Sequence, residues 1–281
     1  MKSFVIKASN FSLSHTLECG QVFRWDKIGV NEYEGVIAGS IVKIRQEKDA
    51  LFIRSSNSRL IPSFIISYFD LTLDLPYIYN TIGQDKHIKA AIAGFKGLRI
   101  IRQPLWECLS SFIISAYNNI PRIKGIIHNL CVCSGKRLVL GKCVYYSFPP
   151  PRLFADSSIG RLKRCGTGFR ASYLKKTARA FLDGKISPRL LKEKPYEEAK
   201  KILMRLDGVG PKVADCVLLY SVGKLGAFPV DIWIKRVMQT LYFNGRQVSE
   251  DKIREFARGY FGKYAGYAQQ YLYHYARRGK W

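Results

Sequence analysis

Two glycines that lie two positions apart, directly before a proline, constrain this chain more than any other feature. The run from Glu197 to Leu206 has apolar residues at helical spacing, and Asp207-Gly208-Val209-Gly210-Pro211 then interrupts it. Glycine reaches the positive φ angles of a sharp turn, and proline is tolerated at the first position of a helix. Helical spacing resumes at Lys212. Residues 197–220 are therefore predicted to form a helix, a tight hairpin and a second helix.

The predicted hairpin has a chemical use. Its backbone N–H groups are unpaired at the positive end of a helix dipole, which is a place that binds phosphate. Lys212 lies in the first turn of the second helix, where the dipole disfavours the ammonium and favours a nucleophilic amine. Farther along, Asp231 precedes another helical run and is suited to cap it. The segment thus predicts a phosphate grip, an activatable amine and a rigidly held carboxylate.

The stretches LDGVGPKVADC and PVDIWIKR resemble the helix-hairpin-helix motif, with its Gly-Pro loop and later aspartate, of DNA base-excision glycosylases. They are most similar to the 8-oxoguanine glycosylase branch, and the resemblance covers most of the chain. It implies that Lys212 and Asp231 are catalytic and that Gly208, Val209 and Gly210 hold DNA. The implied enzyme flips out 8-oxoguanine opposite cytosine, excises it through a lysine Schiff base and nicks the strand by β-elimination.

Two alternatives stay open at this point. One is a glycosylase for another damaged base, either an alkylated purine or an oxidised pyrimidine. The other is a non-catalytic module that uses the hairpin only to hold the DNA backbone, with Lys212 as an ordinary surface residue.

The charge of the chain agrees with a DNA partner. Its 46 Lys and Arg against 21 Asp and Glu give a net charge of +25. A protein this basic is expected to bind a polyanion, and a basic surface or an anionic membrane is the alternative. No apolar run approaches the roughly 20 residues that span a bilayer, and the N-terminus lacks an apolar signal core. We expect an intracellular, monomeric protein that binds double-stranded DNA and no membrane.

The seven cysteines suggest neither a disulfide framework nor a metal site. Cys131 and Cys133 are spaced wrongly for a zinc knuckle and have no histidine pair, so buried free thiols are expected there. No cysteine follows Cys216, so the chain cannot build the four-cysteine iron–sulfur loop of some relatives. We expect no metal and no cofactor.

The fold is predicted to be α+β. Short alternating runs indicate strands in an antiparallel meander over the first part of the chain, at 4–6, 22–25, 33–37, 41–45 and 51–54. The pattern turns helical from about Pro62, and helix signals dominate after Asp85. We predict an N-terminal β domain at 1–80 and a helical glycosylase domain at 81–281.

The lesion pocket is predicted from three places. Gly20 opens a GQVFRW segment, and in the resembled family the glycine carbonyl accepts a hydrogen bond from the N7–H that oxidised guanine has and guanine lacks. By the same resemblance Cys216 and Tyr273 hold the flipped base between them, and Gln269 bonds its Watson–Crick edge. The alternatives are a glycine at a strand entry and a helix packed by tyrosines.

Two further segments are predicted to read the opposite strand. The resemblance assigns Asn118, Asn119 and Arg122 to the gap and the orphaned cytosine, although Tyr117 stands where the family has a further asparagine. The asparagines could instead be ordinary helix caps. Phe169 and Arg170 follow a second glycine turn and match an aromatic wedge and a cytosine-contacting arginine. Either arginine could instead contact phosphate.

Overall fold

A five-stranded antiparallel sheet forms the N-terminal part of the protein, which we describe from a computed structural model over residues 2–57 and 61–279. The strands are β1 (Lys2–Lys7), β2 (Trp25–Gly29), β3 (Glu32–Ile37), β4 (Ser40–Glu47) and β5 (Ala50–Ser55), in the order β1-β5-β4-β3-β2. The predicted meander holds for β2 to β5. The first strand, however, pairs with β5 at the far edge, because the helix α1 (Leu13–Glu18) separates it from β2.

The predicted strand at 22–25 is wrong, since β2 begins only at Trp25. Hydrogen bonds of the buried Gln21 hold the preceding turn in an irregular conformation. Its side-chain amide donates to the carbonyls of Thr16 (2.9 Å) and Arg99 (2.8 Å), and its side-chain oxygen accepts from the N–H of Ile101 at 2.9 Å. These bonds replace the strand ladder that the alternating pattern suggested.

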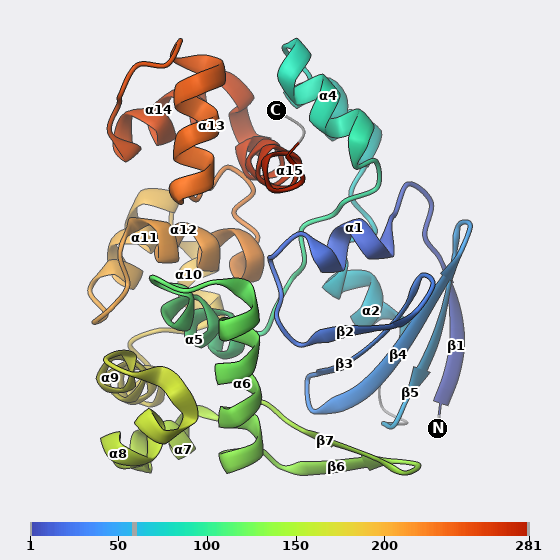
Figure 1. Ribbon diagram of the computed structural model, residues 1–281, viewed down its shortest axis with the longest axis vertical. Helices are drawn as coiled ribbons and strands as arrows, with labels where there is room; N and C mark the ends of the chain where they lie inside the picture. The colour runs from blue at the N-terminus through green and yellow to red at the C-terminus, as the bar shows by residue number, and fades with distance from the viewer. Residues whose placement is uncertain (1, 58–60, 280–281) are drawn as a thin grey trace.

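The remainder of the described chain is mostly helical (Figure 1). Its elements are α2 (Pro62–Tyr68), α3 (Leu75–Ile82), α4 (Lys86–Gly94), α5 (Leu105–Ser115), α6 (Ile120–Ser134), β6 (Arg137–Leu140), β7 (Cys143–Tyr146), α7 (Pro151–Asp156), α8 (Ile159–Leu162), η1 (Lys163–Thr167), α9 (Arg170–Leu182), α10 (Pro188–Glu193), α11 (Tyr196–Met204), α12 (Pro211–Val217), η2 (Leu218–Val222), α13 (Ile232–Tyr242), α14 (Glu250–Phe261), η3 (Gly262–Tyr264) and α15 (Ala265–Arg277).

One hairpin interrupts this helical part, which the sequence reading missed. Strands β6 and β7 alternate around a turn at Gly141, which has φ +61°. The hairpin reaches back to the sheet, where the Tyr145 hydroxyl donates to Glu34 at 2.8 Å. Arg24 adds a second link, because its guanidinium pairs with the half-buried Glu107 of α5 and donates to the carbonyl of Tyr146.

The protein has two hydrophobic cores. Residues of the first, which include Ile44, Ile53 and Phe69, lie between the sheet and the helices α1 and α2. The second core is built mainly from the helices between Leu75 and Ala276, and it also includes Cys19 and Phe23. Because nearly all core residues up to Phe69 belong to the first core and nearly all from Leu75 onward to the second, we propose the domain boundary near residue 80, within α3.

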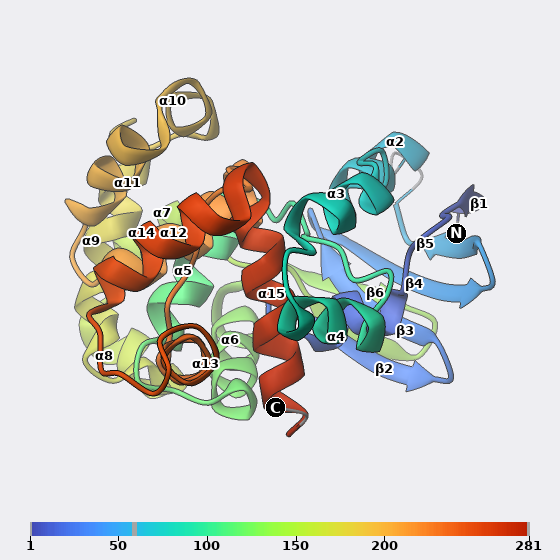
Figure 2. The same ribbon diagram turned by 90° about the horizontal axis from the view of Figure 1, so that it is seen from above.

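The C-terminal helix α15 joins the two parts. Figure 2 shows it between α3 and α4 on one side and the hairpin-bearing helices on the other. Its Gln270 donates to the carbonyl of Cys19 at 2.9 Å, so α15 lies directly against the turn that carries Gly20. Within the described ranges, no helix combines the length and apolarity that crossing a bilayer requires.

Candidate active site

The predicted helix-hairpin-helix is present as α11, a turn at Asp207–Gly210, and α12. Gly208 has φ +78°, and the N–H of Val209 closes the turn on the carbonyl of Leu206 at 3.1 Å. Pro211 is the first residue of α12, as predicted. Gly208 and Gly210 are exposed, whereas Val209 is buried beneath the hairpin. The turn therefore exposes its backbone at the start of α12, and the N-terminal end of a helix favours anions.

Lys212 lies in the first turn of α12, half-buried. Its ammonium donates to the Ser115 hydroxyl at 3.0 Å and stands 5.2 Å from the centre of the Phe112 ring, both on α5. Among the described residues the amine finds its acceptor on Ser115 rather than on a carboxylate. It is therefore positioned without being locked into an ion pair, so that it can leave Ser115 to attack a substrate.

Asp231 caps the start of α13, as predicted. Its carboxylate accepts from the N–H of Ile234 at 2.8 Å, and the N–H of Trp233 also bonds to it. Burial raises the pKa of this carboxyl above 3.8, and the two backbone bonds and the nearby Lys212 charge oppose that rise. The carboxylate is thus fixed at the helix start within the electrostatic reach of Lys212.

Three of the four predicted lesion-contacting positions, Gly20, Cys216 and Tyr273, lie around the same place. Tyr273 of α15 is a contact neighbour of Gly20, since a Cβ built on Gly20 would lie 3.3 Å from its ring. Burial raises the pKa of Tyr273, and Asp231 and Cys216 are near enough to raise it further. Burial likewise raises the pKa of the Cys216 thiol to about 12, against the pull of Lys212. Cys216 is therefore an inert wall, not a second nucleophile.

Gln269 lies one turn before Tyr273 on α15 and is buried. Its side-chain oxygen accepts from the Tyr220 hydroxyl at 3.4 Å. The Tyr220 ring stacks on Phe112, the ring beneath the Lys212 amine, at 5.4 Å between centres. These contacts place Gln269 beside the groups that surround Lys212, in a pre-formed setting.

The predicted gap-filling segment forms the link between α5 and α6. Asn118 donates to the carbonyl of Ile114 at 2.9 Å, and Asn119 caps α6 by accepting from the N–H of Arg122 at 3.0 Å. Both asparagines therefore have the capping role that was the alternative reading. Between these bonds Tyr117 adopts φ +51° and is 96% exposed. A rigid link thus presents a fully exposed aromatic ring in a backbone conformation that such residues rarely adopt.

Phe169 and Arg170 stand beside this link. The Phe169 ring is 54% exposed, whereas Arg170 is buried. The Arg170 guanidinium donates to the carbonyl of Ala116, at 3.0 Å from its Nε, and reaches that of Tyr117 at 3.4 Å. Burial lowers the pKa of Arg170, and the nearby Arg122 lowers it further, so the two arginines are neighbours. Arg170 therefore braces the Tyr117 link against the Phe169 turn.

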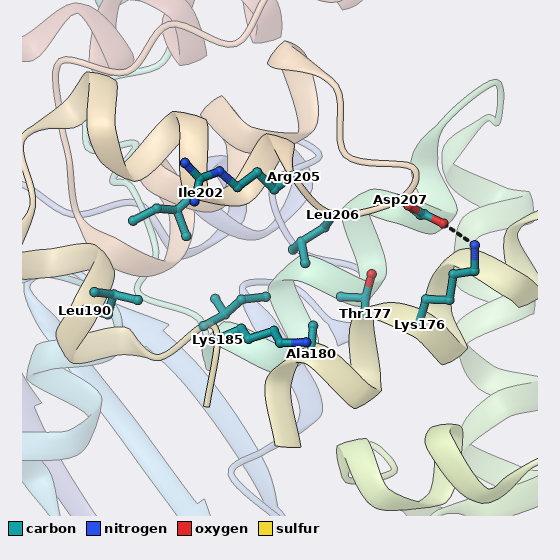
Figure 3. Close-up of a pocket in the computed structure, with 10 residues that line it drawn as sticks. Lys176, Thr177, Ala180, Lys185, Leu190, Ile202, Arg205, Leu206 and Asp207 are labelled. Atoms are coloured by element: carbon teal, nitrogen blue, oxygen red, sulfur yellow. Dashed lines mark hydrogen bonds and ion pairs between the residues drawn. The ribbon is translucent and has the colours of Figure 1, made fainter. Parts of the chain in front are cut away.

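Two cavities lie away from this constellation. One, of about 490 Å³, is formed by α9, α10 and α11 behind the hairpin; Figure 3 shows Lys176 paired with Asp207 at its side, with N–O 2.6 Å. Another, of about 460 Å³, lies between the sheet, α6 and the β6–β7 hairpin. Neither contains a residue predicted for catalysis or lesion binding. Within residues 2–57 and 61–279, no group of three or more His, Cys, Asp or Glu could hold a metal ion.

The sequence reading missed three residues that shape the site. Ser115 holds the amine, and Arg277 lies one turn after Tyr273, with its guanidinium 3.1 Å from a Cβ built on Gly20. Asp215 lies on the buried face of α12. It forms ion pairs with Lys200 of α11 at 3.0 Å and with Arg254 of α14 at 2.9 Å. The position of Arg277 four residues after Tyr273 was the one available signal, because such residues share a helix face.

This fold and site define a DNA-binding protein of the helix-hairpin-helix type. Its Lys212 directly follows the hairpin, and its Asp231 lies at the start of α13. Residues 3–109 match the family described as "8-oxoguanine DNA glycosylase, N-terminal domain". Residues 110–262 match the family described as "HhH-GPD superfamily base excision DNA repair protein". The chain belongs to the HhH-GPD superfamily of base-excision DNA repair enzymes and carries the 8-oxoguanine glycosylase type of N-terminal domain.

Individual relatives agree with this assignment. The "Probable N-glycosylase/DNA lyase" of Methanothermobacter thermautotrophicus is 30% identical, with 97% of this chain and 96% of that protein covered. The "N-glycosylase/DNA lyase" of Saccharomyces cerevisiae is 28% identical over 95% of this chain and 84% of the yeast protein. The structure of the Clostridium acetobutylicum 8-oxoguanine glycosylase/lyase, in complex with dsDNA containing cytosine opposite to 8-oxoG, superimposes with a TM-score of 0.92 at 35% identity, covering 99% of both chains.

Replacing Gly208 with alanine should weaken both the fold and the DNA grip. A Cβ at this position would lie 2.4 Å from Cδ2 of Tyr173, and φ is +78°. Strain and overpacking together should lower the free energy of unfolding by about 2–4 kcal/mol. Gly210→Ala is the matched control, because its Cβ meets nothing within 4 Å. Chemical denaturation and DNA titration of both variants check this; equal stability of the two would contradict it.

Proposed function

We propose that this enzyme removes 8-oxoguanine opposite cytosine from double-stranded DNA and then nicks the strand, with Lys212 as nucleophile. The observation that carries the proposal is the placement of Lys212 directly after a phosphate-binding hairpin, next to a carboxylate that α13 holds in place. A module that only holds the DNA backbone has no need of a lysine amine bonded to Ser115 and a half-buried Asp231 at the start of α13. The names of the relatives support the same activity.

The reaction follows from these two groups. The neutral Lys212 amine attacks C1′ of the damaged nucleoside, and the N-glycosidic bond breaks as the base leaves with the electron pair of that bond. The departing base takes up the proton that the attacking nitrogen loses. The ionised Asp231 stabilises the positive charge that develops on the sugar. Opening of the sugar ring gives a Schiff base. Loss of a C2′ proton then breaks the C3′–O bond, which cuts the strand on the 3′ side by β-elimination.

Recognition of the lesion is assigned to the residues around Tyr273. The flipped purine lies between the Cys216 side chain and the Tyr273 ring, and Gln269 bonds its Watson–Crick edge. The Gly20 carbonyl accepts from N7–H, the group that separates oxidised guanine from guanine. Gly20 has φ +84° and close neighbours in Ile120 and Tyr273, so any side chain there would intrude on this wall.

We assign contacts with the opposite DNA strand to the Tyr117 link and the Phe169 turn, which Arg170 joins. Phe169 opens the stack as a wedge, and Asn118, Asn119 and Arg122 face the orphaned cytosine. Arg170 contacts that cytosine only after its guanidinium leaves the carbonyl of Ala116. Before that exchange, its bonds set the angle at which the wedge and the link approach the duplex.

Tyr117 is expected to fill the gap by stacking, in place of the asparagine common at this position. Truncation in Tyr117→Ala should weaken binding of a duplex with 8-oxoguanine opposite cytosine by about 5- to 150-fold, since base–aromatic stacking contributes about 1–3 kcal/mol per base. Tyr77→Ala, a 50% exposed tyrosine on α3, is the control. Equal dissociation constants for Tyr117→Ala and Tyr77→Ala would show that Tyr117 does not stack in the gap.

Borohydride trapping tests the proposal as a whole. A duplex with 8-oxoguanine opposite cytosine should give a covalent protein–DNA adduct and free base. Parallel duplexes with an alkylated purine or an oxidised pyrimidine separate the other glycosylases. Tight binding with equal affinity for damaged and intact duplex, a steep salt dependence and no adduct would instead identify a backbone-binding module.

We further propose that the enzyme acts as an intracellular monomer on double-stranded DNA, without a membrane partner and without a cofactor. The net charge of +25 supports a polyanionic partner, and the chemistry above uses only side chains of this chain. Sedimentation of the free protein and of its complex with a lesion duplex measures the oligomeric state.

A further inference from the structure

Two of the cysteines lie close together outside the active site. Cys133 is exposed in the last turn of α6, and Cys165 lies in η1, the turn that precedes Gly168-Phe169-Arg170. Burial raises the pKa of the Cys165 thiol to about 11, and the nearby Cys133 side chain raises it too. The prediction that Cys133 is buried is therefore wrong: it lies in the final turn of α6, where the helix leaves the core.

The backbones around the two cysteines are held together by several contacts. The Arg161 guanidinium donates to the carbonyl of Cys133 at 2.8 Å. The backbone carbonyl of Arg161 accepts from the Cys165 thiol at 3.6 Å. Asn129 of α6 donates to the carbonyl of Cys165 at 3.4 Å. A Cβ built on Gly166 would lie 3.2 Å from Ile126, so η1 packs closely on α6. The two thiols are thus held as neighbours by the fold.

The other cysteines lack this combination of access and partner. Cys19, Cys108, Cys131 and Cys216 are buried, so an oxidant in solvent does not reach them. Cys143 on β7 is exposed, which makes it a natural comparison. Cys165 is buried but lies close to Cys133, and the charges of Arg161 and Arg164 oppose the rise in its pKa only in part.

We propose that Cys133 and Cys165 are an oxidisable thiol pair that peroxide converts to a reversible disulfide. The Cys133 thiolate attacks one oxygen of hydrogen peroxide, the O–O bond breaks, and a sulfenic acid and hydroxide form. The Cys165 sulfur then attacks the sulfenic sulfur. The S–S bond forms as the S–O bond breaks, and the departing hydroxide takes the thiol proton. Two thiols are oxidised by two electrons in total, and one peroxide becomes two waters.

The Cys133–Cys165 disulfide would connect the two elements that position the residues proposed to contact the opposite DNA strand. Helix α6 begins at Ile120 and carries Arg122, whereas η1 leads directly into Phe169. Closure would join α6 to η1 and enclose the β6–β7 hairpin, α7 and α8 in a covalent loop. It leaves Lys212 and Asp231 untouched, so the inference stands independently of the proposed function.

Peroxide treatment of the full chain, followed by intact-mass measurement and a non-reducing peptide map, tests the pair. Wild type should lose the mass of two hydrogen atoms, yield a peptide that links Cys133 to Cys165, and return to its starting mass with dithiothreitol. Cys143→Ser should behave identically. In Cys165→Ser the link should vanish, and Cys133 should gain oxygen atoms instead. Oxygen addition at Cys133 in wild type without the link, or a link to Cys143, would overturn the proposal.

Discussion

Lys212→Gln should bind a lesion duplex yet release no base and cut no strand. The amide keeps most of the side-chain length and can still donate to Ser115, but it has no nucleophilic nitrogen. Removing the nucleophile leaves only binding and electrostatic contributions, so base release should fall by more than about a thousandfold. Single-turnover release of 8-oxoguanine and borohydride trapping measure the two losses separately.

Lys212→Gln removes a positive charge as well as the nucleophile, so the control variant must lose only a positive charge. Lys43→Gln removes one positive charge from β4, where Lys43 pairs with Glu34 at 2.9 Å. That variant should retain base release and adduct formation. Base release that survives in Lys212→Gln, without strand nicking, would assign glycosidic cleavage to water and leave Lys212 with the lyase step only.

The fold was predictable where local pattern and tertiary demand coincide. Alternating residues in β3 to β5 and helical spacing in α11 and α12 agree with the packing, so those elements were found. The turn at Gln21 was not, because hydrogen bonds to Thr16, Arg99 and Ile101 override a strand-like pattern. Two of these partners lie about eighty positions away along the chain. Local sequence patterns do not predict hydrogen bonds between residues so far apart in the chain.

The site shows the same division. Lys212 and Asp231 were predictable because each belongs to a local device: a hairpin followed by a helix start, and a helix cap. Ser115 could not be predicted as the partner of Lys212, since the two are joined only by the packing of α5 on α12. The bond from Arg170 to the carbonyl of Ala116 could not be predicted either, since residues more than fifty positions apart meet there only through the tertiary fold.

Asp231→Asn should lose most of the activity without losing stability. Asparagine is as good a helix cap as aspartate, so the bond to Ile234 and the start of α13 should survive. What is lost is the negative charge beside the developing sugar cation. A fixed electrostatic group of this kind contributes about 10²–10³ in rate, and the single-turnover rate of base release should fall by about that factor. Asp74→Asn, at the cap of α3, is the matched control and should keep full activity.

The pH dependence separates the charge of Asp231 from its capping role. Burial raises the pKa of this carboxyl above 3.8, so the ionised form costs stability above the raised value and nothing below 3.8. At neutral pH, Asp231→Asn should therefore unfold at the same or a higher temperature than wild type. The wild-type rate should fall in acid as this carboxyl gains its proton, and the variant should lack that fall. A variant that melts earlier and keeps the acid limb would show that Asp231 acts by holding α13 and not by its charge.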